Sequence, residues 1–80
     1  MKSISITSVA DGWMLRSDAI RNEQFFRSGL SAESAAIRLA QGLAGAGESA
    51  QVEIYIRDGS LARRFVVPAL QAHRDHAAVA

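Results

Sequence analysis

The dipeptide Asp58-Gly59 constrains the fold of this 80-residue chain more than any other feature of its sequence. It separates two runs of alternating polarity, residues 51–57 and residues 60–67, and Pro68 ends the second run. Asp-Gly between two such runs is the strongest short-range signal for a β-hairpin with a type I′ turn. The sequence therefore predicts two antiparallel strands joined by a two-residue loop.

A two-residue loop fixes the cross-strand neighbours of this predicted hairpin. The predicted pairs are Ile56 with Leu61, Tyr55 with Ala62, Glu53 with Arg64 and Val52 with Phe65. The same register sets Arg63 opposite Ile54 on the apolar face, where a charged group is unfavourable. Two solutions stay open: the Arg63 side chain extends past the sheet edge to reach water, or a β-bulge resets the register.

A second hairpin is predicted near the start of the chain. Residues 2–9 alternate between polar and apolar side chains, and residues 10–12 (Ala-Asp-Gly) are typical of a tight turn. Residues 13–17 then form the second strand. Residues 18–23 show no periodicity and are expected as a polar loop, whereas residues 24–28 are expected to be extended again.

One amphipathic helix is predicted between the two hairpins, over residues 32–44. The hydroxyl of Ser31 is expected to cap its N-terminus, and Glu33 lies in its predicted first turn, where the helix dipole favours negative charge. Gly45 and Gly47 are expected to end it. The core-facing stripe is rich in alanine, which lets a helix lie close against a sheet. Its members are Ala32, Ala35, Ala36, Leu39, Ala40 and Leu43.

The order strand, strand, helix, strand, strand (ββαββ) predicts an α+β fold in two layers. One antiparallel sheet, built from the two hairpins, carries one helix on one face. The length allows a single domain, placed at residues 1–70, and residues 71–80 are expected to be a flexible tail or a short helix that adds little stability. The side chains expected to be mostly buried are Ile4, Ile6, Trp13, Leu15, Leu39, Leu43, Val52, Ile54, Ile56 and Phe65.

The composition excludes several classes of protein. The chain has no cysteine, which removes disulfides, thiolate metal sites and cysteine nucleophiles. No apolar run approaches the ~20 residues of a membrane-spanning helix, and the first residues alternate in polarity instead of forming a signal peptide. A cytoplasmic protein without a membrane partner is therefore expected. Eight arginines against one lysine, with abundant alanine, are typical of a GC-rich bacterial genome.

The layout resembles a family of small uncharacterised bacterial ββαββ domains of unknown function. The residues that carry the resemblance are Asp11-Gly12-Trp13 at the second strand, the helix from Ser31 to Ala44 with Glu33 and Ala35-Ala36, and the turn Arg57-Asp58-Gly59. The resemblance spans about residues 3 to 67. It implies the fold and adds no activity, because fold alone does not specify function.

Patterns typical of catalysis are missing from the sequence. His73 and His76 have a spacing that can hold a divalent metal on a helix, but both lie in the predicted tail, where incidental solvated histidines are the favoured interpretation. No serine lies in a nucleophile elbow, the carboxylates are scattered, and the glycines close the helix instead of opening it onto a phosphate. We therefore expect no enzyme and no cofactor.

The polar face of the predicted sheet is the remaining candidate for function. Arg16, Tyr55, Arg57 and Arg64 are expected on the side that the helix does not cover. The first hypothesis is a small interaction module that binds a protein partner, or a second copy of the chain, through the sheet face or a sheet edge. The alternative is a nucleic-acid-binding domain that stacks bases on tyrosine and contacts phosphates through arginine. The net charge of only +1 favours the first hypothesis.

Overall fold

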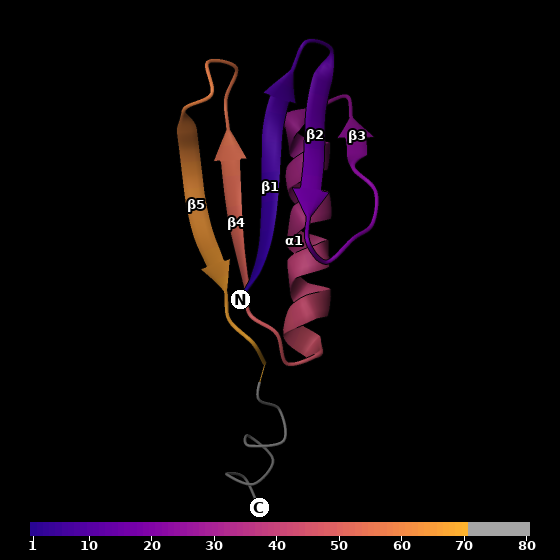
Figure 1. The fold of residues 1–80 in the computed structure, drawn as a ribbon, viewed down its shortest axis with the longest axis vertical. Coiled ribbons are helices and arrows are strands. Elements are labelled where there is room, and N and C mark those ends of the chain that lie inside the picture. Colours follow the sequence, from indigo (N-terminus) through magenta and orange to yellow (C-terminus); the bar gives the residue numbers. More distant parts are fainter. Residues whose placement is uncertain (71–80) are drawn as a thin grey trace, which may run out of the picture.

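The computed structural model describes residues 1–70 as a five-stranded sheet with one helix packed against one of its faces (Figure 1). In chain order the elements are β1 (Lys2–Val9), β2 (Gly12–Ser17), β3 (Gln24–Phe26), α1 (Gly29–Gly45), β4 (Ala50–Tyr55) and β5 (Leu61–Val67). The strands lie in the order β3-β2-β1-β4-β5. The α+β class, the single helix and both hairpins are confirmed. Residues 71–80, which include the predicted tail with His73 and His76, lie outside the described residues.

The prediction of an entirely antiparallel sheet was wrong, because β1 and β4 pair in parallel at the centre of the sheet. The reason is the short strand β3, which pairs antiparallel with β2. It reverses the chain once more before α1, so that α1 runs antiparallel to β1. The chain reverses again after α1, and β4 therefore runs parallel to β1 (Figure 1). Without β3, the helix would deliver β4 in the opposite direction, as the ββαββ prediction assumed.

The helix begins three residues earlier than predicted. Ser28, not Ser31, is the N-cap, and its hydroxyl accepts a hydrogen bond from the backbone N–H of Ser31 at 3.1 Å. Leu30 and Ser31 therefore lie inside α1, and Glu33 lies beyond its first turn. Both serines are good capping residues, and Ser28 lies where the chain leaves β3. The C-terminal end agrees with the prediction, since Gly47 adopts a positive φ of 89° just past the last helical residues.

The core lies between α1 and the sheet. An i, i+4 row of alanines on α1 is buried, and it packs against four fully buried side chains of the central strands. These are Ala32, Ala36, Ala40 and Ala44 on the helix, with Ile4, Ile6, Leu15 and Val52 on the sheet. The small methyl groups bring the helix close to the strands, as expected. The prediction of burial was wrong for Ile56, which follows the end of β4 and is 43% exposed.

The turn between β4 and β5 differs from the predicted type I′ turn. Type I′ needs positive φ at both central residues, but only Gly59 has one (φ 87°). The N–H of Gly59 donates to the Ile56 carbonyl at 2.8 Å, and the N–H of Ile56 donates to Ser60 at 3.0 Å. The connection is therefore a three-residue loop, Arg57 to Gly59, with glycine at its left-handed position.

The predicted register of this hairpin holds from Val52 to Ile54 and fails at Tyr55. Tyr55 pairs with Leu61 instead of Ala62, because a bulge lies between Ile54 and Tyr55. Arg63 stays opposite Ile54, so the predicted conflict is real. The bulge does not remove it.

Two contacts accommodate Arg63 on the helix-facing side of the sheet. Its guanidinium forms an ion pair with Glu33 of α1 and lies 5.2 Å from the centre of the Phe65 ring. The long side chain thus bridges the edge strand and the helix, with its charged end still partly in water. Of the two solutions left open by the sequence, the structure therefore agrees with the first, in which the Arg63 side chain extends to reach water. The ion pair with Glu33 was not predicted.

Candidate functional site

The open face, which we define as the sheet face opposite α1, carries the predicted site. Strand pleating places alternate residues on each face, and the buried residues Ile4, Ile6, Leu15 and Val52 mark the face toward the helix. Their sequence neighbours point to the other side. The cross-strand registers then align the side chains of the open face in rows that run across the sheet.

One of these rows crosses all five strands and is mostly apolar. We call it the apolar row, and it consists of Phe25, Met14, Thr7, Tyr55 and Leu61. Phe25 is 49% exposed and Leu61 is 40% exposed, whereas the three central members are half-buried by their neighbours. Apolar side chains that are aligned on an uncovered sheet form a contiguous surface that a partner can contact, whereas isolated apolar side chains on a surface do not.

The neighbouring row is charged, and its charges alternate in sign. The charged row consists of Arg16, Ser5, Glu53 and Arg64 in register across β2, β1, β4 and β5. Arg16 forms an ion pair with Glu23, which precedes β3, and Arg64 forms one with Glu53 at 2.9 Å. The formal charges of the row are therefore compensated within the protein itself.

Glu53 is the centre of the polar network on the open face. Its carboxylate accepts hydrogen bonds from the Tyr55 hydroxyl at 3.0 Å, the Gln51 amide at 2.9 Å and the Arg64 Nε at 3.0 Å. The Tyr55 hydrogen bond is the largest of the effects that hold the pKa of Glu53 below its usual value of 4.5. The same hydrogen bond raises the pKa of Tyr55, so its hydroxyl stays a donor. The network fixes the orientation of the tyrosine ring.

The structure brings three of the four predicted site residues to the open face. Arg16, Tyr55 and Arg64 lie on neighbouring rows of β2, β4 and β5. Arg57 does not lie on a strand, because β4 ends at Tyr55 and Arg57 belongs to the turn. It is exposed at the end of the hairpin, beyond the apolar row.

Sequence reasoning missed the central role of Glu53 in the polar network of this face. The Glu53–Arg64 pair was predicted from the register, but the attachment of Tyr55 to the same carboxylate was not. The signal was present, since Glu53 and Tyr55 are two residues apart on one strand and therefore share a face. Phe25 was missed as well, because its face depends on the pairing of the short strand β3 with β2.

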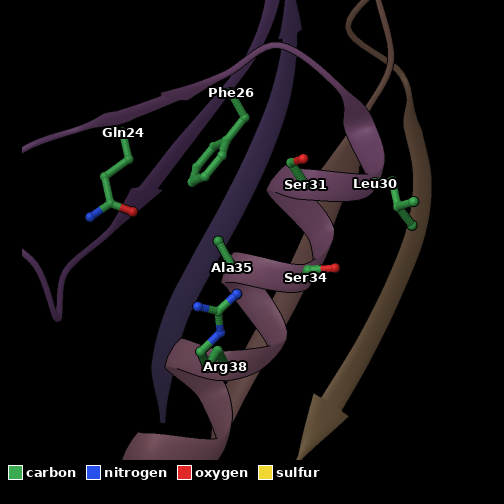
Figure 2. Close-up of a pocket in the computed structure, with 7 residues that line it drawn as sticks. All are labelled: Gln24, Phe26, Leu30, Ser31, Ser34, Ala35 and Arg38. Carbon is green, nitrogen blue, oxygen red and sulfur yellow. The ribbon is translucent and has the colours of Figure 1, made fainter.

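A second surface feature is a groove of about 560 Å³ between β3 and the first turns of α1 (Figure 2). Figure 2 shows Phe26 pointing from β3 toward Ala35, with the Arg38 guanidinium beside Ala35 and Leu30 directed away from the ring. The groove is open and shallow. No group of three or more His, Asp or Glu side chains within residues 1–70 is placed to hold a metal ion.

No helix in the part of the chain that the structure describes is long and apolar enough to span a bilayer. No family model, curated protein or solved structure matches this chain. The resemblance to small bacterial domains of unknown function therefore stays a prediction, and the case for function is built on the open face itself.

Proposed function

We propose that this protein is a small non-catalytic interaction module that binds a protein partner through the open face of its sheet. The observation that carries the proposal is the apolar row, which presents Phe25, Met14, Tyr55 and Leu61 in register across the uncovered sheet. The proposal includes the expectation from the sequence that the protein is bacterial and located in the cytoplasm. The carboxylates of Glu23, Glu33 and Glu53 all serve as partners of arginines, which supports a structural use of these acids.

Tyr55 is the residue best suited to anchor a partner. It lies near the middle of the apolar row, and Glu53 holds its hydroxyl at 3.0 Å. Fixing the ring before binding lowers the conformational entropy lost in the complex. Buried tyrosines are also enriched among the residues that dominate binding energy. Binding through this face is therefore expected to depend most on the Tyr55 ring.

The alternative, nucleic-acid binding by the same face, has weaker support. Phosphate binding needs cations that are available to neutralise the backbone. Arg16 and Arg64 already form ion pairs with Glu23 and Glu53, so binding a phosphate would require breaking these pairs. Base stacking would depend mainly on Tyr55, the one tyrosine on the strands. Phe25 lies on the same face but on β3, which is separated from β4 by β1 and β2.

A site-specific photo-crosslinker tests the proposed function. p-Benzoylphenylalanine replaces Tyr55 in one variant and Ser34, an exposed residue of α1, in the control. The partner captured only at position 55 is identified by mass spectrometry, produced in pure form and titrated against the wild-type chain and two variants. Tyr55→Ala should weaken its binding by about 30-fold, as expected for an anchor of about 2 kcal/mol. Ser34→Ala should leave it unchanged.

Two outcomes would refute the proposal. The first is equal crosslinking at positions 55 and 34, or crosslinking at neither. The second is tight binding of 12-nucleotide RNA or DNA, followed by fluorescence anisotropy, that falls steeply between 50 and 200 mM salt. That result, with a loss on Arg64→Ala, would establish the nucleic-acid alternative.

A further inference from the structure

The outer edge of β5 is the longer of the two sheet edges in the part of the chain that the structure describes. β5 ends the sheet, it is seven residues long, and five of these residues are exposed. The other edge strand, β3, has only three residues. An edge strand leaves one side of its backbone N–H and C=O groups unpaired, and short strands are one of the ways in which proteins prevent pairing there. β3 is protected in this way and β5 is not.

The arginines of β5 protect its edge less than their number suggests. Charged residues on an edge strand normally discourage pairing with another chain. Arg63 is directed toward Glu33 on one face of the sheet, and Arg64 toward Glu53 on the other face. Both charges are therefore paired above and below the sheet, and the edge between them stays free for backbone hydrogen bonds.

We infer that β5 pairs antiparallel with β5 of a second copy of this chain, around a two-fold axis at Phe65. The bulge at one end and Pro68 at the other delimit a regular segment of β5, residues 63–67, and Phe65 is its midpoint. A two-fold axis perpendicular to the sheet pairs each residue with one on the same face of the second copy. Centred on Phe65, it sets Arg63 opposite Val67, Arg64 opposite Val66, and Phe65 opposite itself.

The neighbouring registers are worse for identifiable reasons. A centre at Arg64 would place two Arg64 side chains directly opposite each other, and like charges in this position are destabilising. A centre at Val66 would bring Pro68 opposite Arg64, and proline cannot donate to the ladder. The pairing also keeps the two helices apart, because α1 packs mainly over β1, β4 and β2 and has fewer contacts with the edge strand β5.

This arrangement makes one continuous ten-stranded sheet with both open faces on the same side. It reaches beyond the proposed function, because the dimer needs only the β5 edge and the proposed function needs the apolar row. A five-residue ladder is a small interface, so we expect a dissociation constant on the order of 10 μM. A chain that stays monomeric and still binds its partner through Tyr55 would overturn the dimer alone.

Two measurements test the inference. Sedimentation equilibrium should show a dimer whose dissociation constant rises at least 10-fold in Val66→Lys, because lysine then lies opposite Arg64 of the second copy. Val66→Glu should bind as tightly as wild type or more tightly. Val66 is 49% exposed, so the monomer tolerates both changes. A wild-type chain that is monomeric at about 1 mM, or a dimer equally affected by lysine and glutamate, would overturn the inference.

Disulfide crosslinking between introduced cysteines measures the register of the two β5 strands. The chain has no cysteine of its own, so every disulfide comes from the introduced residues. A tagged Arg64→Cys chain mixed with a Val66→Cys chain should crosslink, since directly opposed residues have Cα atoms about 4.5–5.5 Å apart. Arg64→Cys alone should crosslink much less, because its two copies would lie roughly 8 Å apart in this register. Gln24→Cys, on the β3 edge, is the control. Preferential crosslinking of Arg64→Cys with itself, or crosslinking at position 24, would overturn the inference.

Discussion

Gly12 provides a direct test of how β3 packs onto the rest of the sheet. A Cβ atom at this position would lie 2.3 Å from the Phe26 carbonyl oxygen and 2.7 Å from the tip of the Phe25 ring. The backbone at Gly12 has no positive φ, so the restriction is purely steric. Ordinary contact begins near 3.4 Å, and Gly12→Ala therefore requires β3 to move away by about 1 Å. The Phe25 ring can rotate, but the carbonyl belongs to the backbone.

The expected loss of stability follows from this displacement. Forcing an extra methyl group into a packed site typically costs 1–3 kcal/mol. The loss has an upper limit, because the chain can release the three residues of β3 instead of unfolding completely. We therefore expect Gly12→Ala to lower the free energy of unfolding by about 2 kcal/mol. In a domain of this size that corresponds to a melting temperature lower by roughly 8–16 °C.

Gly42→Ala is the matched control, since it is the same substitution at an exposed position of α1. No atom lies within 4 Å of its added Cβ, so the change should stabilise the helix by about 0.5–1 kcal/mol. Thermal and chemical denaturation followed by circular dichroism measure both variants. A Gly12→Ala melting temperature within about 2 °C of wild type, beside the expected gain for Gly42→Ala, would refute the close approach of β3 to Gly12.

Three further predictions address the core, the turn and the polar network. Ala36→Leu should destabilise the protein by about 1–3 kcal/mol in urea titrations, whereas Ser34→Leu on the exposed side of the helix should change stability by less than about 0.5 kcal/mol. Gly59→Ala should cost about 1–2 kcal/mol by the same assay, because alanine strains the left-handed backbone at this position. The pKa of Glu53 is lowered on folding, so its stabilising contribution is present above pH 4.5 and is lost as the pH falls through the folded-state value. Glu53→Gln should therefore show a smaller loss of stability than wild type between pH 7 and pH 3; an equal loss would refute this assignment.

The parts of the fold that the sequence predicted well are those set by local periodicity. Period-two alternation identified β1, β2, β4 and β5, and the alanine stripe identified α1. The pairs Glu53–Arg64 and Val52–Phe65 followed from counting across the turn. The positions of these strands and of the helix follow from apolar side chains that repeat every two residues in a strand and every three to four in a helix. They do not depend on how the elements pack together.

Two of the errors lie where the sequence allows two local solutions. Ser28 and Ser31 can both cap a helix, and the chain uses Ser28 because β3 ends two residues before it. Asp58-Gly59 fits both a two-residue and a three-residue loop, because glycine at the second position suits either. The bulge at Tyr55 then absorbs the extra residue and restores the predicted pairs further along the strand.

The most consequential error was leaving β3 out of the strand count. A strand of three residues shows too little periodicity to be recognised from sequence, yet it determines the direction of every element that follows. By reversing the chain before α1, it makes β4 parallel to β1, and it gives Phe25 a place at the end of the apolar row. The candidate site therefore depends on residues 24–26 as much as on the arginines and the tyrosine that the sequence singled out.

If β3 were released, the central strands would still bury Ile4, Ile6 and Val52 against the alanines of α1. The apolar row would lose its exposed aromatic end. The stability of the core and the extent of the proposed binding surface are thus set by different strands of the same sheet.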